Sequence, residues 1–274
     1  MADLSPLRQR VVSAAVLLPA AVAAIWLGGW AYAGLVVAAG ALMAWEWACM
    51  VYGRPWGVEM ALLAGAVIST GIAAMIVPVA YVFVLAIVFW GAAVVFAAFA
   101  RRDLIWRVLA TPYICVPIVA LILLRRDPDL GLAAILWLFC VIWATDICAY
   151  FTGRALGGPK LAPRASPNKT WSGLAGGVAG AAAVGVATAM ILGQGSVVVL
   201  AAFSGTLAVA GQGGDIAESA IKRHFGVKDS SKLIPGHGGV MDRVDGLVAA
   251  AFVAFAVGWL RSGGQSAAHG ALVW

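Results

Sequence analysis

Carboxylates in the C-terminal half of the chain have the spacing of a site for a divalent cation. A polar stripe at helical positions i, i+3, i+4 and i+7 consists of Asp215, Glu218, Ser219 and Lys222. Asp242 and Asp245 lie one helical turn apart where a later apolar run begins. Capping of a helix N-terminus stabilises a carboxylate by about 0.3–1 kcal/mol and explains one of that pair, but not both together with Asp215. Because Mg²⁺ is commonly held by one or two carboxylates and by phosphate oxygens, these residues predict a magnesium site.

Basic side chains crowd the same segment. They are Lys222, Arg223, Lys228, Lys232 and Arg243. Their charge suits a polyphosphate, and carboxylates for a metal beside cations for phosphates indicate phosphoryl or nucleotidyl transfer. The sequence has no Ser-His-Asp or Cys-His arrangement and no P-loop, so neither covalent catalysis by the protein nor a P-loop nucleotide site is predicted.

Two polar segments add groups that suit a phosphate. The glycines of IPGHGG (234–239) allow backbone N–H groups to approach a phosphate closely. His237 within it binds the nucleotide, transfers a proton or caps the turn, and the sequence leaves all three roles open. SPNKT (166–170) carries Lys169, which either contacts a phosphate or lies in a solvated linker. These segments fall in the two longest polar loops, 152–170 and 215–245, where we expect the chemistry.

Two carboxylates lie inside apolar runs. An ionised Asp146 at such a depth costs about 2.5–3.5 kcal/mol on insertion scales, so it needs a partner. Tyr150 and Arg154 follow at i+4 and i+8, on the same face of a helix. An Asp146–Arg154 pair that locks helices is one interpretation, and a functional carboxylate is the other. Glu46 in AWEWAC has no such neighbour, and packing and function are equally open for it.

The composition identifies the kind of protein that positions these residues. Hydrophobic residues make up 63% of the 274-residue chain and charged residues only 11%, against about 25% charged in soluble proteins. This composition predicts an integral membrane protein with a single domain, 1–274. The net charge of +6 comes from basic residues in short loops between apolar segments. Membrane topology explains such loops, so nucleic-acid binding is not expected.

Nine apolar runs are each long enough, or nearly so, to cross a bilayer as a helix of about 20 residues. They are residues 11–28, 31–52, 58–77, 79–100, 104–124, 130–151, 171–193, 196–214 and 245–260. Pro78 divides the long run from Val58 to Ala100, because proline ends or kinks a helix. The first run follows Arg8 and Arg10 like a secretory signal, but a second run follows it at once, so we expect an uncleaved span. The predicted fold is all-α, a polytopic membrane protein with about nine transmembrane helices.

Basic residues are distributed asymmetrically about these spans. With the N-terminus in the cytoplasm, only Arg125, Arg126 and Arg261 of the 18 basic residues face outward. Arg101 and Arg102 belong to the larger set that faces inward. Because an excess of Lys and Arg marks cytoplasmic loops, the N-terminus and both long polar loops are predicted to be cytoplasmic.

Residues 219–245, SAIKRHFGVKDSSKLIPGHGGVMDRVD, closely resemble the signature of the phosphatidate cytidylyltransferases, also called CDP-diacylglycerol synthases. Every constrained position of that signature is met, from the Lys-Arg pair through His-Gly-Gly to the final Asp-Arg-apolar-Asp. The resemblance continues in WATDICAYFTGR, SPNKTW and GDIAES, so the catalytic motifs fall within 131–260. The first 130 residues resemble the family only as hydrophobic spans, and Ser172 stands where relatives commonly carry glutamate.

This resemblance implies a multi-pass enzyme of the bacterial cell inner membrane. Such an enzyme transfers CMP from CTP to phosphatidic acid and releases pyrophosphate, with Mg²⁺ as cofactor and a second cation left open. The lipid phosphate itself attacks the α-phosphorus, so no protein nucleophile is required. The family resemblance also implies a homodimer.

The matched motifs assign roles to individual residues as expectations. The expected metal ligands are Asp215, Asp242 and Asp245, with Ser219. The expected catalytic residues are Asp215, Lys222, Asp242 and Asp245. The expected substrate-binding residues are Asp146, Lys169, Ser219, Arg223, Lys228, Asp229, His237 and Arg243.

Other functions share part of this pattern. DRVDG also begins the motif of the CDP-alcohol phosphotransferases, but no further acid follows Gly246 in the ninth apolar run. A CTP-dependent polyprenol or phytol kinase shares the metal and nucleotide chemistry and would transfer the terminal phosphate instead. An ion-coupled membrane transporter would explain Asp146 and Glu46 but not the dense polar loop. A membrane scaffold with a basic loop leaves the aspartates unexplained.

Overall fold

The computed structural model describes residues 6–100 and 104–274. Arg101 and Arg102, two of the basic residues predicted to face the cytoplasm, lie outside the described residues, as does the side chain of Arg10. Within the described ranges the chain forms ten helices and one two-stranded sheet. Residues up to Ile122 form a first unit together with Phe225–Val244, and Leu123–His224 form a second unit together with Asp245–Trp274.

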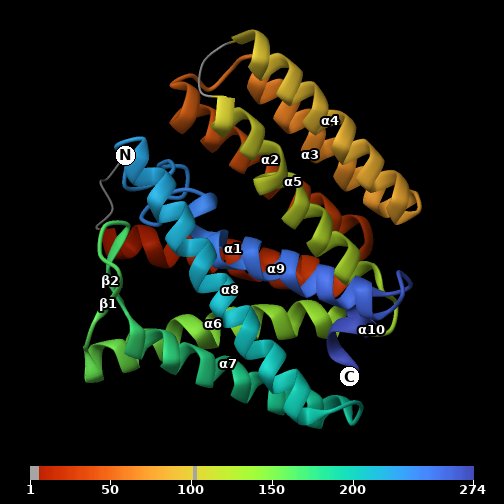
Figure 1. Ribbon diagram of the computed structural model, residues 1–274, viewed down its shortest axis with the longest axis vertical. Coiled ribbons are helices and arrows are strands. Elements are labelled where there is room, and N and C mark those ends of the chain that lie inside the picture. Colours follow the sequence, from red (N-terminus) through yellow and green to blue (C-terminus); the bar gives the residue numbers. More distant parts are fainter. Residues whose placement is uncertain (1–5, 101–103) are drawn as a thin grey trace. The chain divides into compact units, whose positions relative to one another are not determined.

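The first unit is a set of long apolar helices. It contains α1 (Pro6–Leu27), α2 (Gly29–Tyr52), α3 (Val58–Ile76), α4 (Val79–Ala100) and most of α5 (Leu104–Arg126). α2 packs against α1 and α3, and α3 packs against α4 (Figure 1). A Cβ on Gly71 would lie 2.3 Å from Cγ2 of Val37, so glycine at this position lets α3 approach α2 closely. The break between α3 and α4 confirms the predicted division at Pro78.

The second unit places a glycine-rich helix between two others. It contains α6 (Gly131–Leu156), α7 (Trp171–Leu192), α8 (Val197–His224), most of α9 (Met241–Arg261) and α10 (Ala267–Leu272). α7 packs against both α6 and α8, and α6 and α7 run side by side in Figure 1. A Cβ on Gly173, Gly177 or Gly180 would lie 3.0 Å or less from an atom of α6. Small residues therefore allow the close packing of α6 and α7, as is common between membrane helices.

A short β-hairpin connects α6 to α7. Strands β1 (Lys160–Ala162) and β2 (Ser166–Thr170) pair antiparallel, with Lys160 opposite Thr170. The Oγ1 of Thr170 accepts a hydrogen bond of 3.1 Å from the N–H of Gly173, so Thr170 caps α7. The SPNKT segment, predicted to be part of a loop, is thus β2, and Lys169 is fixed one residue before the N-cap of α7.

The helices match the predicted spans closely. Eight of the described helices, α2 to α9, are long and apolar enough to cross a membrane, and a shorter apolar stretch, Val11–Leu27, lies within α1. These helices confirm the all-α, polytopic fold class. α8 continues past its predicted apolar run, which ends at residue 214, to His224, as the helical spacing of Asp215, Glu218, Ser219 and Lys222 predicted. Lys222, Arg223 and His224 suit the C-terminal end of the helix dipole. α9 begins at Met241 rather than at 245, and α10 was not predicted. The orientation and the single-domain organisation stay predictions.

Candidate active site

Three glycines bring α8 and α9 into contact within the second unit. A Cβ on Gly214 would lie 2.7 Å from the backbone oxygen of Asp245 and 2.7 Å from Cβ of Ala249. A Cβ on Gly211 would lie 3.3 Å from the backbone oxygen of Gly246. Because glycine allows this close approach, the residue after Gly214, which is Asp215, is held near Asp245.

The acidic group of the second unit consists of Asp146, Asp215 and Asp245, from α6, α8 and α9. Asp146 and Asp245 each interact electrostatically with Asp215 and with Lys169. The Nζ of Lys169 forms an ion pair with Oδ2 of Asp215, whose side chain is 29% exposed. The structure therefore brings together four of the residues that the sequence predicted for the site.

Gln212 links members of this group and was missed in the sequence. Its Oε1 accepts a hydrogen bond of 2.8 Å from Nζ of Lys169, and its Nε2 donates to Oδ1 of Asp146 over 3.4 Å. The link thus runs from α6 through α8 to β2. Gln212 lies three residues before Asp215, on the same face of α8, and this spacing is the signal that would have identified it.

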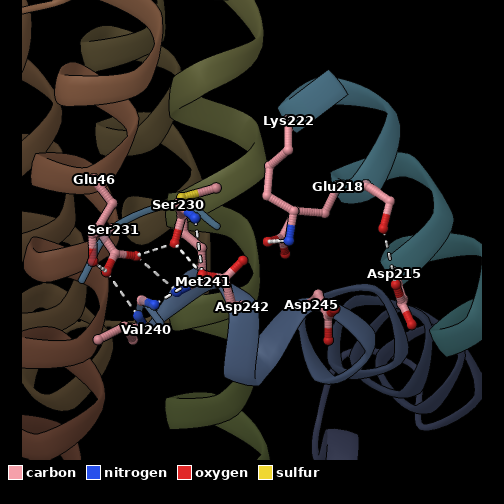
Figure 2. Close-up of polar contacts among 12 residues, drawn as sticks. Glu46, Asp215, Glu218, Lys222, Ser230, Ser231, Val240, Met241, Asp242 and Asp245 are labelled. Carbon is pink, nitrogen blue, oxygen red and sulfur yellow. Dashed lines mark hydrogen bonds and ion pairs between the residues drawn. The ribbon is translucent and has the colours of Figure 1, made fainter. Parts of the chain in front are cut away.

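Glu218 and Lys222 form an ion pair of 3.0 Å one turn further along α8 (Figure 2). The Glu218 side chain is fully buried and that of Lys222 is 10% exposed. Lys222, predicted to hold a phosphate, therefore carries a carboxylate partner of its own, and it also interacts electrostatically with Asp245. Ser219, a predicted ligand, donates a hydrogen bond of 3.3 Å to Oδ1 of Asp215.

Acceptor capacity remains on the carboxylates of Asp215 and Asp245. Oδ1 of Asp245 accepts a hydrogen bond of 2.8 Å from the N–H of Gly246, and no residue in the described ranges donates to its Oδ2. The 3.3 Å bond to Oδ1 of Asp215 is long for a hydroxyl donor. An ionised carboxylate has about four acceptor positions, so both side chains have lone pairs left for a cation.

The signature loop, residues 228–243, belongs to the first unit and lines a cavity of about 750 Å³ that is open to solvent. The cavity is lined by Lys228, Asp229, Ser231, Lys232, Ile234, Pro235, Gly236, His237, Gly238 and Arg243. A tight turn shapes it: the N–H of Ile234 donates to the oxygen of Gly238 over 2.8 Å, and Gly238 has a φ of 85° that favours glycine. The Nδ1 of His237 is buried and has no hydrogen-bond partner among the described residues.

Asp242, near the end of the signature loop, accepts hydrogen bonds from earlier residues of the same loop. Its Oδ2 accepts hydrogen bonds from the N–H of Ser230 at 2.9 Å, from Oγ of Ser230 at 2.9 Å and from the N–H of Gly239 at 2.8 Å. Asp242 belongs to the first unit and Asp245 to the second. Within residues 6–100 and 104–274, no group of three or more His, Cys, Asp or Glu side chains is arranged to hold a metal ion. The ligand set of Asp215, Asp242 and Asp245 stays a prediction.

Three residues whose partners the sequence left open have defined contacts. Arg154 donates a hydrogen bond of 2.8 Å to the hydroxyl of Tyr150, an exposed neighbour, so the Asp146–Arg154 pair does not form. Ser172 donates to the carbonyl of Gly157, just after α6, and contacts Thr170, so it supports the hairpin junction. Glu46 of α2 accepts hydrogen bonds from the signature loop, including the N–H groups of residues 240 and 241. Arg223 is exposed near the end of α8.

Comparison with known proteins covers nearly the whole chain. A sequence model described as the cytidylyltransferase family matches residues 8–260. A phosphatidate cytidylyltransferase of Brucella suis is 41% identical over 272 residues, which cover 93% of this chain and 94% of the relative. Proteins of the same name are 37% identical in Pseudomonas aeruginosa, with 92% and 98% covered, and 33% identical in Haemophilus influenzae, with 89% and 96% covered.

These matches correct one expectation. The first 130 residues were expected to resemble the family only as hydrophobic spans, but the matched region begins at residue 8. The N-terminal helices, including the one that carries Glu46, are therefore part of the shared sequence. Matched from residue 8 to residue 260 and over most of the length of several relatives, the chain belongs to the cytidylyltransferase family.

Proposed function

We propose that this chain is a membrane-bound nucleotidyltransferase that transfers CMP from CTP to phosphatidic acid and yields CDP-diacylglycerol and pyrophosphate. The relatives named phosphatidate cytidylyltransferase support the substrates, since they align over more than nine tenths of the chain in Brucella suis and Pseudomonas aeruginosa. The observation that carries the chemistry is the cavity of the signature loop, because it combines several cations with an imidazole nitrogen that has no partner among the described residues.

The cavity receives the triphosphate of CTP. Lys228, Lys232 and Arg243 line it and offset the negative charge of the phosphates. The Nδ1 of His237 supplies a hydrogen bond to the nucleotide, since a buried polar atom without a partner is unfavourable until a ligand satisfies it. A volume of about 750 Å³ lies within the range of small-molecule sites, which is about 300–1,000 Å³.

The acidic group has the donor chemistry for Mg²⁺. Asp215 and Asp245 would hold it, because their oxygens retain acceptor capacity and because Mg²⁺ takes one or two protein carboxylates together with substrate phosphates. Asp242 and Ser219 remain in the predicted ligand set, and a second cation is left open. When bound, the ion neutralises charge on the phosphates that react.

The reaction needs no nucleophile from the protein. An oxygen of the lipid phosphate attacks the α-phosphorus of CTP, a new phosphorus–oxygen bond forms, and the bond to the β-phosphate oxygen breaks to release pyrophosphate. Lys169, held by Asp215 and Gln212, places a fixed positive charge beside the carboxylates. The protein thus contributes position and charge, which provide most of the catalysis in such transfers.

The bilayer and the cytoplasm each deliver one substrate. The apolar helices make this a membrane protein, and we assign it to the bacterial inner membrane with the signature loop on the cytoplasmic side. The asymmetry of basic residues and the bacterial relatives support this orientation. The homodimer implied by the family resemblance remains a prediction that cross-linking in native membranes would test.

Labelled CTP distinguishes this activity from its nearest alternative. Purified protein in detergent is supplied with phosphatidic acid, Mg²⁺ and CTP labelled with ³²P at either the α- or the γ-phosphate. A cytidylyltransferase moves the α-label into the lipid phase and the γ-label into pyrophosphate. A lipid kinase moves the γ-label into the lipid phase instead, and that result would overturn the proposal. Ion flux in proteoliposomes without consumption of CTP would indicate the transporter.

A further inference from the structure

Glu46 is a fully buried carboxylate in α2, with 0% of its surface exposed. Its Oε1 accepts hydrogen bonds of 2.7 Å from Oγ of Ser231 and 2.7 Å from the N–H of Val240. Its Oε2 accepts 2.8 Å from the N–H of Met241 and 3.2 Å from Oγ of Ser230 (Figure 2). No basic side chain in the described residues lies within ion-pair distance of it. The carboxylate is thus held entirely by neutral donors of one loop.

All four donors belong to the signature loop, between 184 and 195 residues further along the chain. Val240 and Met241 stand where α9 begins, and the first N–H groups of a helix have no partner within the helix. Glu46 therefore caps α9 from a distant helix, with a negative charge at the positive end of the helix dipole. Burying a carboxylate in an apolar helix costs free energy. The hydrogen bonds from the signature loop offset this cost and at the same time hold the loop in place.

Gly239 allows the loop to close over the carboxylate. A Cβ on this residue would lie 2.4 Å from Oε1 of Glu46 and 2.0 Å from Oγ of Ser230, which no side chain can accommodate without displacing the contact. Ser230 has a single hydroxyl hydrogen and shares it between Glu46 and Asp242. The second glycine of the His-Gly-Gly motif is therefore required by Glu46, a residue in the N-terminal part of the chain.

The contacts of Glu46 fall on both sides of residues 232–238, which form the larger part of the cavity lining. Ser230 and Ser231 precede residues 232–238, and residues 240 and 241 follow them. Within that segment lie Lys232 and His237, two of the side chains assigned to CTP. A loop whose two ends are fixed has lost much of its conformational entropy before a ligand binds.

We propose that Glu46 is a positioning residue for CTP: it fixes both ends of residues 232–238 and so presets the cavity for the triphosphate. This role rests on the proposed function, since it acts on the site assigned to CTP. It explains why a carboxylate lies inside α2, which neither packing nor the acidic group of the second unit explains. Glu46 touches no reacting atom in this scheme and acts through the loop alone.

Kinetics of Glu46→Gln test the role. The amide places an NH₂ group against donors of the loop, so we expect the KM for CTP to rise about tenfold or more, with the KM for phosphatidic acid unchanged. Glu46→Asp keeps the charge and should recover part of the CTP affinity. The matched control is Glu59→Gln, since Glu59 is also buried, lies in α3 of the same unit, and pairs with Arg54 at 2.9 Å and Arg107 at 2.6 Å outside the loop. It should leave the KM for CTP unchanged.

Hydrogen exchange gives a second readout that needs no activity. In purified protein without substrate, the amides of residues 230–241 should exchange at least tenfold faster in Glu46→Gln than in wild type or Glu59→Gln. If Glu46→Gln does not fold, Gly239→Ala displaces the same contact from the side of the loop without changing a side chain that lines the cavity, and it carries the same two measurements. Equal rises in the KM for CTP in the Glu46 and Glu59 variants would overturn the role, as would an unchanged KM despite faster exchange. A wild type that makes no CDP-diacylglycerol would reject the proposed function, and unchanged exchange in the variant would then reject the anchoring by Glu46 separately.

Discussion

Substituting Gly214 with alanine should separate the two carboxylates that are proposed to hold the metal. The added Cβ would lie 2.7 Å from the backbone oxygen of Asp245, whereas ordinary contacts begin at 3.4 Å, so α8 and α9 must move apart by about 0.7 Å. A misplacement of 1 Å at an active site costs about 100-fold in rate. On a logarithmic scale, 0.7 Å corresponds to a loss of roughly 20- to 30-fold in turnover.

Stability should change much less than turnover. Overpacking costs about 1–3 kcal/mol, and replacing a helical glycine with alanine returns about 1 kcal/mol of helix propensity. The assay measures transfer of α-labelled CMP into lipid at saturating CTP and phosphatidic acid. Thermal unfolding in the same detergent shows whether the variant is folded.

Two neighbouring glycines provide a graded control series. A Cβ on Gly213 would meet nothing within 4 Å, so Gly213→Ala should retain full turnover. A Cβ on Gly211 would lie 3.3 Å from the backbone oxygen of Gly246 and 2.9 Å from a flexible end of Ile142, so its alanine variant should show a small loss. The reasoning is refuted if Gly214→Ala turns over within twofold of wild type, or if Gly213→Ala loses as much.

Three other predictions test separate parts of the chain. Asp245→Asn should lower turnover by about 100-fold or more and raise the Mg²⁺ concentration at half-maximal rate, and an unchanged Mg²⁺ requirement would contradict its role. His237→Ala should raise the KM for CTP by roughly 10- to 100-fold without changing the KM for phosphatidic acid, since it removes one hydrogen bond to a charged ligand. Burial would raise the pKa of Asp127, but hydrogen bonds from the hydroxyl of Ser266 and from backbone N–H groups lower it below its usual value. A lowered folded pKa gives stability above the unfolded pKa that is lost as the pH falls through the folded pKa. Ser266→Ala should therefore lower the Tm more at pH 7 than at acidic pH, where the loss of the α10 cap formed by the same hydroxyl remains.

Periodicity and composition predicted most of the fold. Apolar runs and one proline were enough to place the helices, because a membrane helix satisfies its backbone internally and only its length and polarity must fit the bilayer. Helix ends were less predictable. The start of α9 was predicted at 245 but lies at Met241, whereas the helical spacing of polar residues from 215 to 222 correctly indicated that α8 continues beyond its apolar run.

The contacts of three acidic residues could not be predicted from the neighbouring sequence. Asp242 and Asp245 were predicted as a pair because they lie one turn apart. Because α9 begins at Met241, the two aspartates have different surroundings. Asp242 lies in the first turn and accepts hydrogen bonds from the N–H groups of Ser230 and Gly239. Asp245 lies beyond that turn. Glu46 had no predicted partner because its donors are at least 184 residues away. No spacing rule connects residues at that separation.

The sequence does not show which glycines of this chain tolerate substitution, because that depends on their neighbours in space. The chain has 33 glycines, and Gly213 and Gly214 are adjacent in the same helix. One faces open space and the other meets the backbone of α9 at 2.7 Å, so a substitution that is harmless at the first should displace the carboxylates at the second. In the signature loop, Gly239 likewise lies against Glu46. For Gly214 and Gly239, what lies opposite decides that glycine is required, and in both cases the neighbour is an acidic residue to which function is assigned.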